Sequence, residues 1–129
     1  MRYEISNEFL TVQADTAGAV LWSVKDRDGF EYIWQGDERY WNEHGANLFP
    51  YIARMWEKSY TFQGKTYHMD IHGFAKDSEF KCVKAENKEM VFVLEESEQT
   101  LEQYPFHFSL EIRYLLEGKA LKVVYSVKN

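Results

Sequence analysis

The residues best suited to chemistry gather in the segment Trp41–Lys76. It holds three of the four histidines, His44, His68 and His72, and one arginine, Arg54. A Phe-Pro pair interrupts regular strand pairing here, because proline has no N–H to donate. Imidazole and guanidinium groups on irregular backbone are typical of a site carried by the loops of a rigid scaffold. We therefore expect the functional site in this segment.

Three of these residues suggest a metal site at first sight. His68, Asp70 and His72 alternate, so on a strand they would project from one face, and two imidazoles with a carboxylate form a ligand set of non-haem iron. Same-face neighbours on a strand lie roughly 6–7 Å apart, too far for three consecutive ligands on one ion without a bend. Cupin-like metal barrels also show His-x-His, whereas this chain has His-x-x-x-His. We predict no metal and no cofactor, and keep a small metal-binding β-barrel as the least favoured alternative.

The sequence offers no covalent nucleophile. Cys82 lies in a strand-like apolar run and is expected to fill a small space in the core. There is no Gly-x-Ser-x-Gly, no Gly-rich phosphate loop and no Cys-x-x-Cys. Because a single cysteine cannot form an internal disulfide, its presence favours a reducing compartment and a cytoplasmic location.

Composition excludes several classes of protein. The 129 residues include nine Tyr, nine Phe and four Trp but only seven Gly and two Pro, which excludes disordered and collagen-like chains. The net charge of −6 and the absence of a basic run argue against nucleic-acid binding. The longest apolar stretch, about Met90–Leu94, is far shorter than the roughly 20 residues of a membrane span. We expect one domain over residues 1–129, soluble and not bound to a membrane.

Hydrophobic alternation with a period of two predicts the elements that must position the site. Between Phe106 and Leu116 every second residue is apolar, and Leu121–Val127 repeats this pattern after a Glu-Gly turn, which indicates a hairpin. Further strands are expected at Phe9–Ala14, Ala19–Lys25, Glu31–Trp34, Lys58–Phe62, Thr66–Asp70, Glu79–Ala85 and Met90–Glu95, with a helical turn near Thr100–Gln103. About ten short strands predict an all-β antiparallel sandwich.

Three motifs in a fixed order resemble the aldose 1-epimerase (galactose mutarotase) family, especially its mutarotase-like branch. They are Asn47–Arg54 (NLFPYIAR), Tyr60–Tyr67 (YTFQGKTY) and Asp70–Lys76 (DIHGFAK). The family shows Leu-Phe-Pro, an arginine a few residues on, a Gly-Lys-x-Tyr turn and His-Gly-Phe-Ala-Arg. Tyr104–Phe106 and the closing Val124–Asn129 are also similar. The resemblance implies a twisted antiparallel β-sandwich of the galactose mutarotase-like (supersandwich) type, of which this chain is the N-terminal half.

The resemblance also implies the site residues and the ligand. Arg54 and His72 match the family's sugar-binding arginine and the histidine of its first motif, and Lys76 stands where that motif usually has arginine. These three are the predicted substrate-binding residues for an aldose. The family interconverts the α and β anomers of aldohexoses, which needs a base at the anomeric hydroxyl and an acid at the ring oxygen. The four tryptophans are expected mainly in the core, with one or two near Arg54 and His72 available to stack on a sugar ring.

Two departures from the family pattern shape the functional prediction. Lys76 lacks the planar fork of arginine, and Ala53 stands where glycine is common before the arginine. The family's catalytic histidine and glutamate lie in the half that this chain lacks, so we assign no catalytic residue here and expect a domain truncated relative to the family.

Three hypotheses follow from this truncation. The chain is a shortened sugar-binding protein, a half-enzyme completed by a second copy or a C-terminal-half chain, or a structural, oligomerising β-module. Half of a sandwich leaves apolar strand faces and edges uncovered, which favours oligomers under all three hypotheses.

Overall fold

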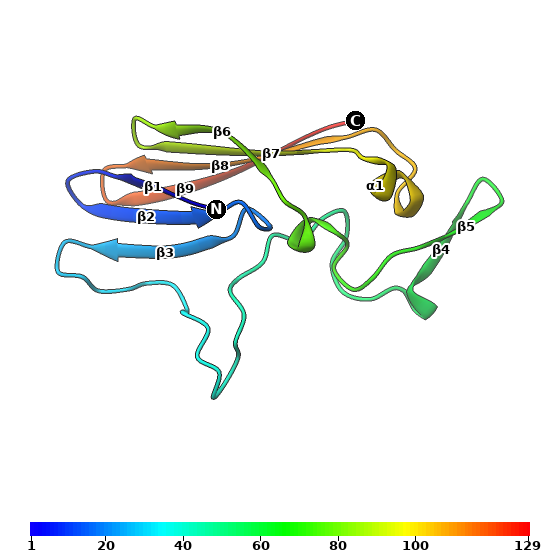
Figure 1. Ribbon diagram of the computed structural model, residues 1–129, viewed down its shortest axis with the longest axis horizontal. Coiled ribbons are helices and arrows are strands. Elements are labelled where there is room, and N and C mark those ends of the chain that lie inside the picture. Colours follow the sequence, from blue (N-terminus) through cyan, green and yellow to red (C-terminus); the bar gives the residue numbers. More distant parts are fainter.

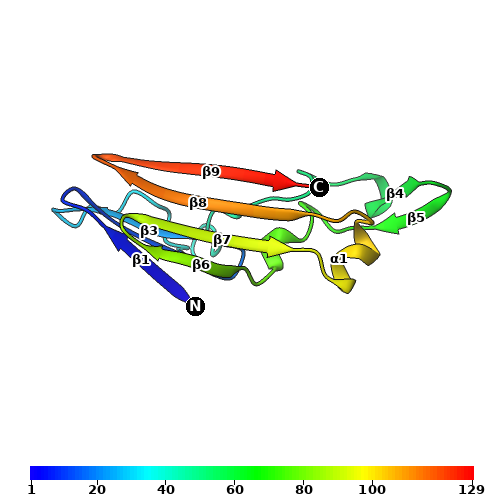
Figure 2. The same ribbon diagram turned by 90° about the horizontal axis from the view of Figure 1, so that it is seen from above.

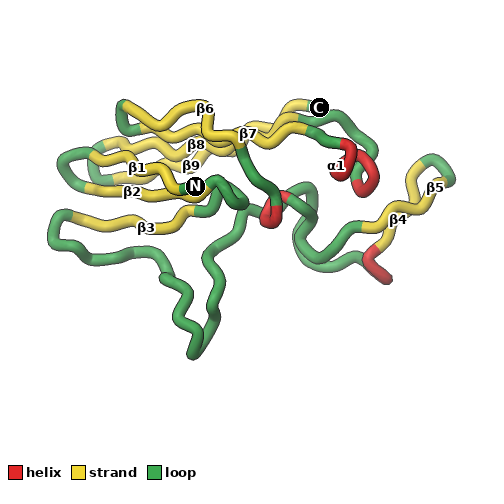
Figure 3. Tube along the Cα trace, in the orientation of Figure 1, coloured by secondary structure: helices red, strands yellow, loops and turns green.

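The computed structural model describes residues 1–129 as a nearly all-β chain with nine strands (Figures 1 and 3). The strands are β1 (Arg2–Ser6), β2 (Leu10–Asp15), β3 (Leu21–Asp26), β4 (Ser59–Phe62), β5 (Lys65–His68), β6 (Lys81–Glu86), β7 (Glu89–Glu95), β8 (Ser109–Glu117) and β9 (Ala120–Lys128). The helical pieces are α1 (Glu98–Gln103) and two 3₁₀ turns, η1 (Trp56–Lys58) and η2 (Ala75–Asp77). None of these helices is long and apolar enough to cross a membrane.

The strands form two larger antiparallel sheets and one separate hairpin. The first sheet has the order β1-β2-β3, the second has the order β6-β7-β8-β9, and β4 pairs only with β5. The two larger sheets face each other, with β1 passing close to β6 and β7 (Figure 2). The β4–β5 hairpin extends away from this body (Figure 1). The predicted antiparallel sandwich is therefore confirmed.

The core lies between the two larger sheets, and period-two alternation explains its composition. On β8 every second side chain is buried, because successive residues of a strand point to opposite faces. Ile112 has no exposed surface and Tyr114 is only 2% exposed. The first sheet contributes Ile5, Val12, Ala14 and Val24 to the same cluster, and β7 contributes Met90, Phe92 and Leu94.

Strand β9 departs from this pattern. Its register places Val123, Tyr125 and Val127 on the core-facing side of the sheet, opposite buried residues of β8. These three side chains are nevertheless 38%, 58% and 53% exposed. We call these three residues the open flank. They are exposed because β9 is the outermost strand of its sheet (Figure 2).

One predicted strand is wrong. Residues 31–34 form no strand, and only a single bridge joins Glu31 to Lys25. The Glu31 carboxylate accepts hydrogen bonds from the Ser23 hydroxyl and from the backbone N–H groups of Val24 (2.8 Å) and Ile33 (3.0 Å). The Glu31 side chain thus accepts from backbone N–H groups that a neighbouring strand would otherwise have paired with, and strand pairing stops here.

The expectation of buried tryptophans is also wrong. Trp22 is partly buried, whereas Trp34, Trp41 and Trp56 are 41%, 48% and 87% exposed. None of the four belongs to the buried cluster. Phenylalanine, tyrosine and aliphatic residues fill the core instead, and the indole rings lie in loops, in η1 or near the start of β3.

Candidate functional site

The site begins at a close crossing of two loops. The backbone oxygen of Phe49 accepts hydrogen bonds from the N–H groups of Phe74 (3.0 Å) and Ala75 (3.2 Å). A Cβ atom on Gly73 would lie 2.2 Å from that oxygen, and Gly73 has a φ of +73°. Only glycine fits both conditions. The crossing therefore fixes the loop of Arg54 against the loop of His72.

His72 and Ala53 are joined by two reciprocal hydrogen bonds. The Ala53 N–H donates to Nδ1 of His72 at 2.9 Å, and the His72 N–H donates to the Ala53 oxygen at 2.9 Å. Because Nδ1 accepts, the neutral imidazole carries its proton on Nε2. Both residues have positive φ, +74° for Ala53 and +67° for His72, a strained conformation for side-chain-bearing residues. His72 thus presents an Nε2–H donor from a loop that is tied to Ala53, the residue before Arg54.

Arg54 lies in a shallow hollow on the surface. The hollow has a volume of about 360 Å³ and is lined by Arg54, Met55, Trp56 and Glu57. The guanidinium makes no ion pair or hydrogen bond within the chain. The indole of Trp56 is 87% exposed. An unengaged five-donor group next to a bare ring can bind a ligand that has both oxygens and an apolar face.

Lys76 lies at a different place. It lines a cleft of about 300 Å³ together with Arg2, Trp22 and His44, and its ammonium pairs with Asp77 at 2.5 Å. The structure therefore ties the loops of Arg54 and His72 together through Ala53 and places Lys76 at another cleft.

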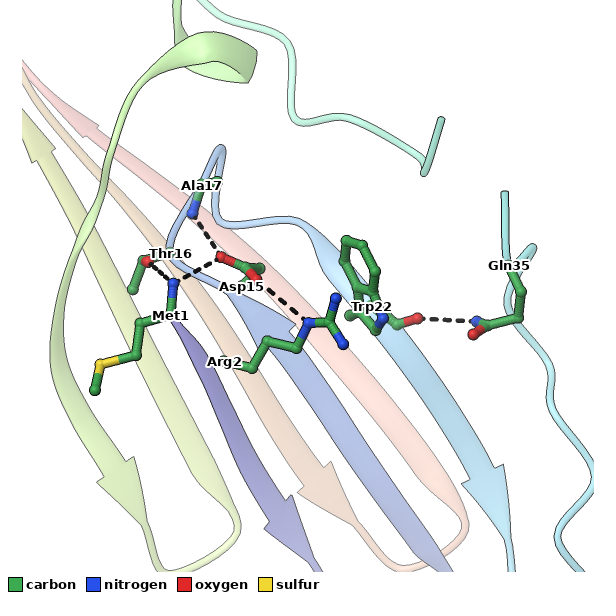
Figure 4. Close-up of polar contacts among 7 residues, drawn as sticks. All are labelled: Met1, Arg2, Asp15, Thr16, Ala17, Trp22 and Gln35. Atoms are coloured by element: carbon green, nitrogen blue, oxygen red, sulfur yellow. Dashed lines mark hydrogen bonds and ion pairs between the residues drawn. The ribbon is translucent and has the colours of Figure 1, made fainter. Parts of the chain in front are cut away.

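Arg2 and Asp15, which line this cleft, belong to a cluster of polar contacts around the N-terminus (Figure 4). The Arg2 guanidinium lies 3.6 Å from the Trp22 ring centroid and the His44 ring 3.8 Å from it, so the two groups occupy opposite faces of the indole. Burial would raise the pKa of Asp15, but hydrogen bonds from the Ala17 N–H, the N-terminal ammonium and Arg2 outweigh it and lower that pKa. These bonds tie the N-terminus to the sheet.

The alternating residues of the metal hypothesis are engaged separately. The Asp70 carboxylate pairs with the Lys58 ammonium at 2.8 Å and accepts from the Ile71 N–H, and these bonds lower the pKa of Asp70. His72 uses Nδ1 for Ala53. No group of three histidine, cysteine, aspartate or glutamate side chains is arranged to hold a metal ion. Cys82 packs against the core, and burial raises the pKa of its thiol.

A cavity of about 870 Å³ borders the loop of His72 at Asp70 and Gly73. It runs between α1, the ends of β6 and β7, and the loop before η2. Carboxylates dominate its charged lining, with Asp70, Asp77, Glu79 and Glu95 against one lysine, Lys81. None of Arg54, His72 and Lys76 lines it.

Sequence reasoning missed the role of Ala53. The β4–β5 hairpin pairs Ser59 with His68 and closes on a Gln-Gly turn. Carried back along both arms, this register places Ala53 opposite Phe74 and His72 opposite Met55. The register therefore indicates that the two loops run side by side, but it does not predict the contact of Ala53 with His72.

Comparison with known proteins identifies the fold class. The chain superimposes with a TM-score of 0.94 on a galactose mutarotase related enzyme from Lactobacillus acidophilus, at 34% identity over 98% of this chain. It matches a galactose mutarotase-like protein from Lactobacillus casei with a TM-score of 0.95, at 33% identity over 100% of this chain. The architecture is that of the galactose mutarotase-like sandwiches, as predicted.

Sequence comparison gives the family. The aldose 1-epimerase family profile matches residues 1–129, and the chain belongs to that family. It is 34% identical over 135 aligned residues to the chromosomal LacX protein of Lactococcus lactis subsp. lactis. All of this chain is covered, but only 45% of LacX, and only 43% and 44% of the two solved chains. The match falls in the N-terminal half of these longer relatives.

Proposed function

We propose that this chain binds an aldose through Arg54, His72 and Trp56. The observation that carries the proposal is the reciprocal pairing of Ala53 with His72, which ties the His72 loop to the residue before Arg54 and leaves the His72 Nε2–H and the Arg54 guanidinium without partners in the chain. Sugar hydroxyl and ring oxygens accept from such donors, and the apolar face of a sugar ring packs on an indole. Sugar binding by Lys76 stays a prediction, because Lys76 lines another cleft.

The proposed activity is that of the family, aldose 1-epimerisation, with an acid and a base that this chain does not supply. Opening the hemiacetal needs a base at the anomeric hydroxyl and an acid at the ring oxygen. His72 has no free basic nitrogen in its neutral form, because Nδ1 accepts from Ala53. Arg54 is always protonated. These residues therefore orient the sugar rather than move its protons. The single unpaired cysteine, Cys82, supports a cytoplasmic location.

A second candidate function is a structural, oligomerising module without sugar binding, in which two copies of the chain cover each other. The exposed apolar residues of the open flank favour it, because monomers rarely leave such rows uncovered.

A ligand titration separates these two functions. Tryptophan fluorescence is recorded while D-galactose or D-glucose is added to the wild type, Arg54→Ala, His72→Ala and Arg39→Ala. Arg39 is a matched control, because it is an exposed arginine that pairs with Asp37 away from the site. We expect Arg54→Ala and His72→Ala each to weaken binding by about ten-fold or more, and Arg39→Ala to leave it unchanged. The absence of any response in the wild type would refute sugar binding and favour the structural module.

A further inference from the structure

We infer that Lys58 and Asp70 are positioning residues for the candidate site. Their ion pair holds the turn Trp56–Lys58 in the conformation that exposes the Trp56 ring in the hollow of Arg54. The hold on this turn is argued from geometry alone. Only its effect on sugar binding rests on the proposed function.

The turn Trp56–Lys58 has a backbone conformation that its own residues do not favour. Glu57 and Lys58 follow one another with φ values of +52° and +51°. Consecutive side-chain-bearing residues in the left-handed region are strained, and such a conformation persists only where surrounding contacts impose it. Inside the turn the only support is the Lys58 N–H, which donates to the Met55 oxygen at 3.1 Å. Contacts from outside the turn therefore hold it.

Those contacts come from residues 69–72. The Met69 N–H donates to the backbone oxygen of Lys58 at 3.0 Å, and the Lys58 ammonium lies 2.8 Å from Oδ1 of Asp70. The same carboxylate oxygen accepts from the Ile71 N–H at 2.8 Å, which orients the carboxylate. Lys58 is thus held both by its backbone and by its side chain.

The four residues that line the hollow, 54–57, are therefore held at both ends by residues 69–72. Before them, Ala53 and His72 exchange two hydrogen bonds of 2.9 Å. After them come the two contacts of Lys58. A segment held at both ends keeps its side chains in a fixed arrangement, which lowers the entropy lost when a ligand binds.

The ion pair of Lys58 and Asp70 is the only one of these contacts that joins two side chains. It lies at the surface, with side chains that are 51% and 64% exposed. Ion pairs this exposed contribute little to overall stability and are screened by salt. Loss of the pair should therefore leave the fold intact and let the strained turn relax, which moves the Trp56 ring away from the ligand position.

A sugar titration of the full chain tests this role against a matched pair. Lys122 and Glu117 also lie 2.8 Å apart, with side chains 52% and 50% exposed, on the β8–β9 hairpin. We expect Asp70→Asn and Lys58→Gln each to weaken binding of D-galactose by about three-fold, and Glu117→Gln to leave it unchanged. The exchanged pair, Lys58→Asp with Asp70→Lys, should recover most of the lost affinity.

Salt dependence distinguishes a positioning ion pair from a general loss of structure. At an ionic strength of about 1 M the Debye length is only about 3 Å, so the pair is screened. The wild type should then lose about the same three-fold in D-galactose affinity, whereas Asp70→Asn should lose nothing further. An equal salt effect on both proteins would overturn the positioning role.

A measurement without sugar separates this inference from the proposed function. The tryptophans are replaced by fluorotryptophan, and the fluorine resonance of Trp56 is assigned with Trp56→Phe. We expect the resonance to move in Asp70→Asn and to stay in place in Glu117→Gln; an unmoved resonance overturns the positioning role. A moved resonance in a chain that binds no sugar would leave the hold on the turn standing and refute the proposed function. Sugar binding that Asp70→Asn does not weaken, or that Glu117→Gln weakens equally, would do the reverse.

Discussion

Strands β8 and β9 carry the same pattern on the same face of one sheet, yet they have opposite environments. Ile112 on β8 is completely buried, and its cross-strand neighbour Tyr125 on β9 is 58% exposed. The alternation of apolar residues is equally regular in both strands. Alternation therefore tells which way a side chain points, whereas burial depends on whether another layer lies over it. The difference between the two strands marks where the covering layer ends.

The largest expected effect comes from comparing two glycines, one packed against backbone and one facing open space. Gly73 and Gly64 have nearly equal φ, +73° and +76°, but a Cβ on Gly73 would meet backbone at 2.2 Å, whereas nothing lies within 4 Å of one on Gly64. We expect Gly73→Ala to lower the free energy of unfolding by at least about 4 kcal/mol, and Gly64→Ala by about 1–2 kcal/mol from its backbone conformation alone. Urea unfolding followed by circular dichroism measures both. Equal losses of unfolding free energy would mean that the backbone at Phe49 moves away to admit the added methyl group at position 73.

The second prediction compares the two strands directly. Ile112→Ala leaves a cavity between two packed sheets, so we expect it to cost about 2–5 kcal/mol of unfolding free energy. Val123→Ala on the open flank should cost about 0.5 kcal/mol or less, because its side chain already contacts water. Urea unfolding of the isolated chain gives both values. A large loss for Val123→Ala would show that something covers β9 in the chain as it stands.

These contrasts also show how far the sequence predicts the fold. Most strands and turns follow from alternation and from Gly-containing turns, because both are local properties of the backbone. The strand predicted around Glu31 was wrong, because the Glu31 carboxylate takes the place of a strand partner through its contacts with Ser23 and Val24. The prediction of buried tryptophans was wrong for a related reason. Residue type gives only a tendency toward burial, whereas the position of the residue in the fold decides its exposure.

The candidate site was predicted less completely. Arg54 and His72 came from a resemblance, and the structure adds the contact that relates them, through the backbone of Ala53. Lys76 belongs to the same motif as His72, but the η2 turn directs it to the cleft of Trp22 and His44. Neighbours in a motif need not share a site when the chain turns between them.

The third prediction uses two tyrosines that share Asn47. Burial raises the pKa of Tyr114, on β8, to about 12, and burial also raises the pKa of the more exposed Tyr125. A raised folded-state pKa adds stability that is present below the ordinary value of 10.0 and is lost as the pH rises toward about 12. We expect the wild type to lose on the order of 2 kcal/mol more than Tyr114→Phe across this window. Tyr125→Phe is the control and should retain most of the wild-type loss, as measured by urea unfolding at each pH.

The smallest expected effect is the most informative about the open flank. In the isolated chain, Val127→Ala and Val83→Ala should each change the unfolding free energy by about 0.5 kcal/mol or less, because both side chains are half exposed. In a fusion of residues 1–129 to the part of Lactococcus lactis LacX that follows the region matched by this chain, Val127→Ala should become clearly more costly, by about 1 kcal/mol, because its methyl groups are then buried. Val83→Ala should stay near zero, because it lies on β6, at the opposite edge of the sheet. Thermal unfolding of both variants and their parents, isolated and fused, measures the change. A Val127→Ala cost that does not rise in the fusion would mean that β8 and β9 differ for reasons other than a missing covering layer.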